Sequence, residues 1–501
     1  MKIFSTAQIR EWDTYTIAHE PIASIDLMER AAGACCKWIT ASHPFTGKAF
    51  HLFCGKGNNG GDGLALARLL LEKHIPAVVY ILEFGHKGTD DFQTNLARLH
   101  ALPPDAIGAE IHYIQSEAHF PRLPENAVIV DALLGSGLNR PLEGLTAGLV
   151  SYLNQCRRPI IAIDIPSGMR ADQPCSNDPM ILATFTLTLG TYKLGLLLPE
   201  NALASGEVHL LPIGLDPAYE AETYTPYQLT DLPLVQRYFR PRGAFANKGN
   251  FGHALLYAGA RGKMGAAVLA SKACLRSGVG LLSCLVEPEF LSIIQISVPE
   301  AMAITDPAGV DPKAYKSFGI GPGIGTGPEA LERLSWILDQ AVFPMVIDAD
   351  AINLLAVNPN LWEKVPPYSI LTPHPKEFER LFGPSADNYA QLDKALEQSA
   401  GRRCYIVLKG HRTFVACPDG SGYFNSTGNA GMATGGSGDV LTGILTGLLA
   451  QGYPPQHAAV LGVYLHGLAG DLALSGQSME SLLASNLAES LGAAFRFIAG
   501  A

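Results

Sequence analysis

Short apolar runs alternate with longer amphipathic segments through the first half of the chain. The runs lack the every-second-residue alternation of a half-exposed strand, which is typical of parallel strands covered by helices on both faces. One intervening segment, 63–73, has helical spacing. The predicted strands are 49–53, 77–82, 127–130, 160–163, 184–189 and 208–211. This order of strands and helices predicts a Rossmann-like, three-layer αβα domain.

The alternation stops between residues 217 and 240, where Asp, Glu, Tyr, Pro and Thr replace the apolar runs. A second series then begins, and long helices are expected after Gly438 and around 457–472. Its predicted strands are 254–257, 280–286, 342–347, 369–371 and 405–408. We therefore predict an α/β domain over 1–216, a linker over 217–240 and a second α/β domain over 241–501.

Length and composition narrow the class of protein. A chain of 501 residues exceeds one core of usual size, and 48% hydrophobic with 16% charged residues is typical of a globular protein. The net charge is −10 and no face collects Lys and Arg, so we expect small-molecule substrates and no nucleic-acid partner. The nine Cys form no C-x-x-C pair, which disfavours both a disulfide framework and a zinc site.

Targeting signals are not apparent in the sequence. The first residues lack the apolar core of a signal peptide, and the most apolar stretch, 180–198, is interrupted by Thr, Gly190 and Lys193. We therefore expect no membrane association and a cytoplasmic location.

A glycine-rich loop follows the first predicted strand. Gly55, Gly57 and Gly60 fit G-x-G-x-x-G, and Glu83 follows the next strand as a ribose-binding acid would, so a dehydrogenase has to be considered. Glycine backbone and free N–H groups at a helix start suit a phosphate. A dehydrogenase does not explain the Asn58 to Asp62 insert, whose side-chain oxygens are hard ligands or hydrogen-bond acceptors.

Polar residues also end two further strands of this half. Asp131 and Asp164 each follow an apolar run, and Ser167 lies three residues after Asp164. The carboxyl ends of parallel strands lie side by side, so Asn59, Asp131 and Ser167 could converge on one cation and leave Asp164 as acid or base. The alternative is that both Asp residues cap the loops that follow. Lys193 is expected to be a solvated loop lysine.

The second half contains a glycine-rich turn before a helix. Backbone N–H groups from Gly436 to Gly438 could hold a transferring phosphoryl group, and Asp439 could take a proton from the attacking hydroxyl. The alternative is a turn that serves packing alone. Three other segments follow predicted strands. Residues 409–413 offer a cation and hydrogen-bond donors for nucleotide phosphates, and 348–353 suits an outer-shell Mg²⁺ site. His374 lies between two prolines that would fix its ring in the site, and the alternative is a structural histidine.

The N-terminal motifs, at 54–63, 131–138 and 164–168, resemble the NAD(P)HX epimerase family over about residues 5–215. The resemblance implies interconversion of the R and S epimers at C6 of a hydrated nicotinamide. It places the substrate at Asn58, Asn59, Gly60, Gly61, Asp62, Gly135, Ser136, Gly137, Leu138, Asn139, Arg140, Pro141 and Asp164. It places a potassium ion at Asn59, Asp131 and Ser167.

Six motifs of the second half, at 259–267, 319–325, 348–353, 372–375, 409–413 and 435–439, resemble the ADP- or ATP-dependent NAD(P)HX dehydratases, which have a ribokinase-like fold. The match covers about residues 247–500. The resemblance implies hydrated-nucleotide contacts at Ala266, Gly323, His374 and Asp439. It implies ADP or AMP contacts at Lys409, Gly410, His411, Arg412, Thr413 and Gly438, and use of Mg²⁺.

Together these observations predict a bifunctional repair enzyme for NADHX and NADPHX, with Asp164 and Asp439 as catalytic groups. The second half would dehydrate the S epimer, and release AMP and phosphate if ADP is the donor. A vitamin or sugar kinase with an N-terminal ligand-binding domain is the alternative, and an N-terminal half that only binds is a third. We expect the chain to form a homo-oligomer.

Overall fold

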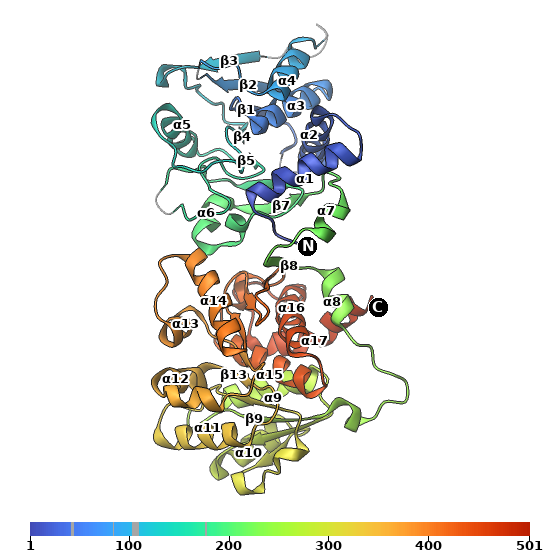
Figure 1. Cartoon of the computed structure of the whole chain (residues 1–501), viewed down its shortest axis with the longest axis vertical. Coiled ribbons are helices and arrows are strands. Elements are labelled where there is room, and N and C mark those ends of the chain that lie inside the picture. The colour runs from blue at the N-terminus through green and yellow to red at the C-terminus, as the bar shows by residue number, and fades with distance from the viewer. Residues whose placement is uncertain (42–44, 84, 103–109, 176–177, 501) are drawn as a thin grey trace. The chain divides into compact units, whose positions relative to one another are not determined.

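The computed structural model describes residues 1–41, 45–83, 85–102, 110–175 and 178–500 (Figure 1). The chain divides into two compact units, Lys2–Thr225 and Pro226–Ala501, and Met1 belongs with the second. Each unit has its own sheet and its own core.

The N-terminal unit contains a seven-stranded sheet in which all neighbours are parallel. The strands are β1 (Ala49–Cys54), β2 (Ala77–Leu82), β3 (Glu110–Ile114), β4 (Ala127–Ala132), β5 (Ile160–Ile163), β6 (Phe185–Leu189) and β7 (Glu207–Leu211). Their order is β3-β2-β1-β4-β5-β6-β7, so the order reverses between β1 and β4, where open α/β sheets form a ligand crevice. The six predicted strands are confirmed, and only the edge strand β3, which is mostly exposed, was missed.

Helices cover both faces of this sheet (Figure 1). Phe50 and Leu52 of β1 pack in the core that α2 and α3 share, whereas Phe53 and Ile129 pack on the opposite side with α5. The α-helices are α1 (Thr6–His19), α2 (Ser24–Ala41), α3 (Asn58–Glu72), α4 (Asp90–His100), α5 (Gly144–Gln155), α6 (Ala202–Ser205) and α7 (Pro217–Glu222). The predicted three-layer αβα arrangement is confirmed.

The C-terminal unit contains a ten-stranded sheet in the order β11-β10-β9-β12-β13-β14-β15-β16-β17-β8. Strand β16 is antiparallel to both neighbours, and every other pair is parallel. The strands are β8 (Tyr227–Thr230), β9 (His253–Tyr257), β10 (Leu281–Leu285), β11 (Met302–Ile304), β12 (Ser317–Ile320), β13 (Val346–Ile347), β14 (Ile370–Leu371), β15 (Tyr405–Leu408), β16 (Phe414–Ala416) and β17 (Gly422–Asn425).

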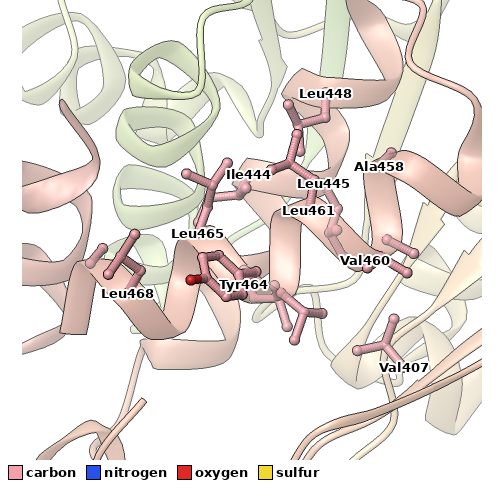
Figure 2. Packing of buried hydrophobic residues seen from close by; sticks show 14 of the residues in the cluster. Val407, Ile444, Leu445, Leu448, Ala458, Val460, Leu461, Tyr464, Leu465 and Leu468 are labelled. Atoms are coloured by element: carbon pink, nitrogen blue, oxygen red, sulfur yellow. The ribbon is translucent and has the colours of Figure 1, made fainter. Parts of the chain in front are cut away.

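Helix α15 is the centre of the C-terminal core. Every residue from Val440 to Ala450 is buried, as expected for a helix that is apolar on all sides. Figure 2 shows Ile444 and Leu445 of α15 against Leu461 and Leu465 of α16. The helices of this unit are α8 (Leu232–Tyr238), α9 (Met264–Arg276), α10 (Leu291–Ser297), α11 (Pro328–Gln340), α12 (Ala349–Val357), α13 (Pro375–Phe382), α14 (Asn388–Arg402), α15 (Ser437–Ala450), α16 (Pro455–Ala473) and α17 (Ala484–Ala499).

The segment 217–240, predicted to be a linker, forms α7, β8 and α8 instead. Asp216 and Asp231 cap α7 and α8, and a proline occupies the first turn of each helix, so the residues that indicated a linker are helix starts. Strand β8 pairs with β17, and Val235 of α8 is fully buried in the C-terminal core. The units meet in sequence at Thr225 and Pro226, ahead of the predicted start at 241.

Within the described ranges, no helix has the length and apolar character that crossing a bilayer requires.

Candidate active sites

A cavity of about 680 Å³ lies at the carboxyl ends of β1, β4, β5 and β6 in the N-terminal unit. Ten residues predicted for substrate line it: Asn58, Asn59, Asp62, Gly135, Ser136, Gly137, Leu138, Asn139, Arg140 and Asp164. Asn59 and Asp164 lie close together here, because a Cβ added to Gly135 would lie 3.3 Å from Asn59 Cβ and 3.7 Å from Asp164 Oδ2. The carboxyl ends of the parallel strands therefore bring segments that are distant in sequence to one site.

Gly60, Gly61 and Pro141 do not line this cavity. A Cβ at Gly60 would collide with the carbonyl oxygen of Gly55, and one at Gly61 would lie 2.7 Å from Met28 Sδ. These two glycines allow α3 to begin directly against the loop after β1. Their side of the helix therefore serves close packing, while Asn58, Asn59 and Asp62 face the cavity.

Asp164 and Lys193 form a buried ion pair at the cavity wall. The Lys193 side chain is 1% exposed, and its Nζ also donates to Thr188 Oγ1 at 3.1 Å and to the Leu189 carbonyl at 2.9 Å. Asp164 holds a left-handed backbone with φ of 68°, a strained conformation for a non-glycine residue. The expectation that Lys193 is a solvated loop lysine is therefore wrong, because the loop after β6 turns its side chain inward.

Asp131 and Ser167 join the loops after β4 and β5 beneath the cavity. Ser167 donates to the fully buried Asp131 carboxylate through its backbone N at 2.7 Å and its Oγ at 2.6 Å, and Leu133 N donates a third bond at 3.2 Å. Burial raises the pKa of Asp131 to about 6, although these hydrogen bonds oppose the shift. Asp131 thus caps the loops, as the alternative interpretation proposed, and neither residue lines the cavity.

The side chain of Asn59 leaves its hydrogen-bonding groups unused at this site. Its side chain is 8% exposed, and neither its Oδ1 nor its Nδ2 has a hydrogen-bond partner among the described residues. A buried amide without partners is costly unless a ligand or ion completes it. The free Oδ1 is the type of oxygen ligand that suits a hard monovalent cation.

Helix α1 contributes two charged residues that the sequence analysis missed, Arg10 and Asp13. Burial, together with the nearby charge of Asp164, raises the pKa of Asp13 to about 6 despite the opposing effect of Lys193. Burial also raises the pKa of Asp62 well above its usual value, and Asp164 and Asp13 add to the shift. Nothing in the local sequence of α1 indicates this role, because the helix reaches the cavity only through the tertiary fold.

Glu83 does not behave as a ribose-binding acid. Its carboxylate forms an ion pair with Lys56, accepts a hydrogen bond from Gly85 N at 2.7 Å and does not line the cavity. The hydrogen bond from Lys56 lowers the pKa of Glu83. This arrangement disfavours the dehydrogenase interpretation of the glycine-rich loop.

The C-terminal site begins at the N-terminus of α15. Gly436 caps this helix with φ of 93°, and no side chain in the described part of the chain accepts a hydrogen bond from its first turn. A Cβ at Gly436 would lie 2.5 Å from Leu269 Cδ1, so both conformation and space require glycine. The Ser437 N–H donates to the Thr434 carbonyl at 3.4 Å, whereas the N–H groups of Gly438 and Asp439 have no partner among the described residues and can bind an anion.

A cavity of about 520 Å³ opens beside this helix start. Five residues predicted for the nucleotide line it: Lys409, Gly410, His411, Thr413 and Gly438. Arg412 is absent from the lining because its guanidinium donates to the Ser426 carbonyl at 2.9 Å and stabilises the loop instead.

Lys409 connects the helix start to a buried carboxylate. Its Nζ donates to Asp348 Oδ1 at 2.9 Å, and Thr442 Oγ1 of α15 donates to Asp348 Oδ2 at 2.6 Å. Burial disfavours the charged ammonium, but Asp348 and Glu377 outweigh burial and raise the pKa of Lys409. A Cβ at Gly438 would lie 3.5 Å from Lys409 Nζ, so a fixed positive charge stands at the uncapped end of α15.

Asp439 lies in the first turn of α15, next to this cation. Burial, and then the negative charge of Asp348, raises the pKa of Asp439 to about 6, while Lys409 opposes the shift. A carboxyl group with this pKa is ionised at neutral pH and can still accept a proton, which suits a general base.

The other residues predicted for the hydrated nucleotide lie outside the lining of this cavity. Ala266 and Gly323 adjoin each other, since a Cβ at Gly323 would lie 3.2 Å from Ala266 Cβ. His374 caps α13, where its Nδ1 accepts from Lys376 N at 3.2 Å and Glu377 N at 3.4 Å, and its Nε2 lies 3.3 Å from Glu377 Oε1. His374 thus caps α13, and Glu377 Oε2 lies 3.8 Å from Lys409 Nζ.

The 348–353 segment does not gather its polar groups at one point. Asp350 Oδ2 accepts from Gly325 N at 2.8 Å and pairs with Lys263 at 3.3 Å, whereas Asn353 Oδ1 accepts from Arg380 at 2.8 Å. No set of three His, Cys, Asp or Glu residues within the described ranges is arranged to hold a metal. Asp348 is the member of this segment that lies at the start of α15, where Lys409 and Thr442 donate to it.

His466 lines the cavity beside α15, and no pattern in the sequence predicted it. Its Nε2 lies 2.9 Å from the Ser437 carbonyl, and burial lowers its pKa to about 4, so the ring is neutral at physiological pH. Its position at the middle of a buried helix gives no sequence signal beyond a lone polar residue in an apolar run.

Comparison with known proteins covers both units. A family model described as "YjeF-related protein N-terminus" matches residues 24–195, and one described as "NAD(P)H-hydrate dehydratase" matches 254–492. A bifunctional NAD(P)H-hydrate repair enzyme of Moorella thermoacetica is 34% identical, over 98% of this chain and 96% of its own length.

Two solved structures match the C-terminal part. The crystal structure of a ribokinase-like superfamily protein from Enterococcus faecalis is 29% identical, with a TM-score of 0.50, over 55% of this chain and 98% of that chain. That of an ADP/ATP-dependent NAD(P)H-hydrate dehydratase from Bacillus subtilis, co-crystallised with ATP and Mg²⁺, is 32% identical, with a TM-score of 0.49, over 54% and 98%. The ribokinase-like fold predicted for the second half is confirmed.

Proposed function

Because the chain belongs to the family of bifunctional NAD(P)H-hydrate repair enzymes, we propose that its two cavities catalyse two consecutive steps on hydrated nicotinamide nucleotides. The N-terminal cavity interconverts the R and S epimers of NADHX and NADPHX. The C-terminal cavity dehydrates the S epimer to NADH or NADPH at the expense of a nucleotide. The observation that carries this proposal is the uncapped start of α15, with Lys409 and Asp439 beside it.

The epimerisation needs a group that moves a proton at C6. This carbon bears both a hydroxyl group and the ring nitrogen, so its configuration is lost when one of these bonds breaks and reforms. Asp164 faces the cavity as a carboxylate held by Lys193, and its position is fixed by a strained backbone. We assign Asp164 the proton transfer at C6, and the polar lining from Gly135 to Arg140 the nucleotide.

A potassium ion fits the polar groups around Asn59. The unpartnered Asn59 Oδ1 would hold it, and Asp131 and Ser167, which do not line the cavity, are the other ligands that the family resemblance implies. The bound ion would supply positive charge to the anionic nucleotide. Meanwhile Ser167 and Asp131 hold the two loops together through their own hydrogen bonds.

The dehydration begins with phosphoryl transfer, because hydroxide is a poor leaving group and phosphate a good one. Asp439 takes the proton of the C6 hydroxyl, whose oxygen attacks the terminal phosphorus of the donor. The N–H groups at the start of α15 and the ammonium of Lys409 stabilise the negative charge on the transferred group. The ring nitrogen then expels phosphate, and loss of a proton from C5 gives the dihydropyridine.

ADP or ATP is the donor that fits the C-terminal cavity. With ADP as donor, the products are AMP and phosphate. The residues that surround the nucleotide phosphates are Lys409, Gly410, His411, Thr413 and Gly438, but not Arg412. Mg²⁺ carried by the nucleotide would neutralise charge on its phosphates. In the cavity wall, Asp348 keeps Lys409 in place, and the neutral His466 fixes the Ser437 carbonyl at the helix start.

The test supplies the full chain with (6R)- and (6S)-NADHX, ADP and Mg²⁺, and follows nicotinamide absorbance, AMP and phosphate. We expect the whole mixture to become NADH, with one AMP and one free phosphate for each NADH. A kinase would instead leave the phosphate on its product. If the S epimer is consumed completely while the R epimer disappears only at its spontaneous rate, the N-terminal unit binds a ligand but does not catalyse epimerisation.

A further inference from the structure

Four carboxyl groups and one ammonium group line the cavity of the N-terminal unit. They are Asp13 of α1, Asp62 of α3, Asp91 of α4, Asp164 in the loop after β5 and Lys193 in the loop after β6. Lys193 is committed to Asp164 by an ion pair. Arg10, one turn before Asp13, also lines the cavity, and its guanidinium packs on Gly137, where a Cβ would lie 2.5 Å from Nη2.

Asp164 pairs with Lys193, and Asp91 accepts a hydrogen bond from Ser24. Asp13 shares with Asp62 the lack of such a partner. It has no hydrogen bond or ion pair with any described residue, although its carboxyl is mostly buried. It occupies the face of α1 that meets the cavity, together with Ile9, Arg10, Thr14 and Ile17, whereas Glu11 points away and accepts a hydrogen bond from Tyr219. A buried carboxyl group that the fold neither pairs nor caps is available to the substrate.

We propose that Asp13 is a second catalytic acid–base group of the epimerisation, acting opposite the Asp164–Lys193 ion pair. The inference rests on the proposed epimerase function. Any route through a broken bond at C6 needs one group that gives a proton to the departing atom and another that takes a proton when the bond reforms. Two carboxyl groups in different environments divide these tasks.

The environments of the two groups decide which one gives the proton. Asp164 is paired with the ammonium group of Lys193, so we assign Asp164 the role of the base. Burial and the charge of Asp164 raise the pKa of Asp13 to about 6, so Asp13 keeps its proton to higher pH than an exposed aspartic acid. The other charged groups that line the cavity are Arg10, Asp62, Asp91, Arg140 and Lys193, and Lys193 opposes the rise in the pKa of Asp13.

The proposed step conserves atoms and charge. The C6–O bond breaks, its electron pair stays on oxygen, and this oxygen takes the proton of Asp13 and departs as water. The lone pair of the ring nitrogen forms a double bond to C6. Water then adds to C6 from the opposite face, its electron pair closes the new C–O bond, and its proton passes to Asp164. The two carboxyl groups exchange roles in the reverse direction.

The experiment uses the full chain with purified (6R)-NADHX, without ADP, and measures formation of the S epimer by chromatography against an enzyme-free control. The variant is Asp13→Asn, which keeps the shape and removes the proton donor. The matched control is Glu11→Gln, the same change on the same helix but away from the cavity. ADP and Mg²⁺ are then added to check that each sample still dehydrates the S epimer.

We expect kcat of Asp13→Asn to fall by about 100-fold or more, which is typical for loss of a general acid. KM should change little, and Glu11→Gln should match the unchanged protein. The unchanged protein should also lose kcat/KM as pH rises above about 6, when Asp13 gives up its proton, and this limb should be missing from Asp13→Asn.

Three results would overturn the inference: a kcat of Asp13→Asn equal to that of the unchanged protein, a loss confined to KM, or an alkaline limb that persists in the variant. Failure of the unchanged protein to speed epimerisation above the spontaneous rate would be a different result. It would refute the proposed epimerase function itself, and the Asp13 inference with it.

Discussion

Replacing Asp439 by Asn should make the C-terminal unit more stable while abolishing its dehydratase activity. Burial and the charge of Asp348 raise the pKa of this carboxyl from 3.8 to about 6, so folding disfavours its ionised form. The folded chain therefore binds more protons than the unfolded chain between these values, and stability falls as pH rises through that window. Above about pH 6 the full cost of the buried charge is present.

The size of this cost follows from the shift. About two pKa units correspond to about 3 kcal/mol at neutral pH. Asp439 is partly solvated, and the start of α15 favours a negative charge by about 0.3–1 kcal/mol, which Asn forfeits. We therefore expect Asp439→Asn to stabilise the unit by about 1–2 kcal/mol at about pH 8, and by close to zero at about pH 4. Dehydration should slow by about 100-fold or more.

Chemical denaturation read by hydrogen exchange in peptides of α15 and α16 isolates this unit from the N-terminal one. Glu489→Gln, an exposed acid on α17, is the matched control and should show no pH-dependent difference. A variant that is less stable than the unchanged protein at about pH 8, or a difference that stays constant with pH, would refute the reasoning from burial.

Three further substitutions test other parts of the two sites. Lys193→Met leaves Asp164 buried without its cation, so the N-terminal unit should lose about 3–5 kcal/mol in denaturation experiments along with its epimerase activity; an unchanged stability would contradict the buried ion pair. Gly436→Ala should lower the stability of the C-terminal unit by about 1–3 kcal/mol and remove most dehydratase activity, because the φ of 93° and the Leu269 side chain oppose a Cβ. Gly435→Ala is the control and should be neutral, because its Cβ would meet no atom within 4 Å. Lys409→Met should weaken ADP binding by about tenfold or more in calorimetry, and Lys376→Met, exposed on α13, should not; equal affinities would remove Lys409 from the nucleotide site.

The sequence predicted the interior of the N-terminal sheet well, but in the C-terminal sheet it missed the buried strands β12, β16 and β17. Apolar runs without alternation gave β2, β5 and β15 their bounds, because strands buried on both faces must be continuously apolar. Strands with an exposed face or very short length, such as β3 and β11, give no such signal and were missed. The linker prediction was wrong because Asp and Pro at helix starts resemble a linker in composition.

The candidate sites were predictable where a polar residue ends a strand. Asp164, Asn59 and the loop from Gly135 were placed at one cavity by that rule alone. Lys193 also follows a predicted strand, so the same reasoning applied to that strand would have placed Lys193 at the cavity. Asp13 and His466 lie within helices, and only the folding of α1 and α16 onto the sheets brings them to the cavities.

The position of β8 limits how the two activities can be separated in a gene. A fragment that starts at residue 241 lacks this strand and the buried Val235, so it would expose the backbone of β17 as an open edge able to recruit other chains. A fragment that starts at Pro226 keeps the sheet edge covered. Recombination that exchanges either half between relatives would therefore preserve solubility only if residues 226–240 travel with the C-terminal half.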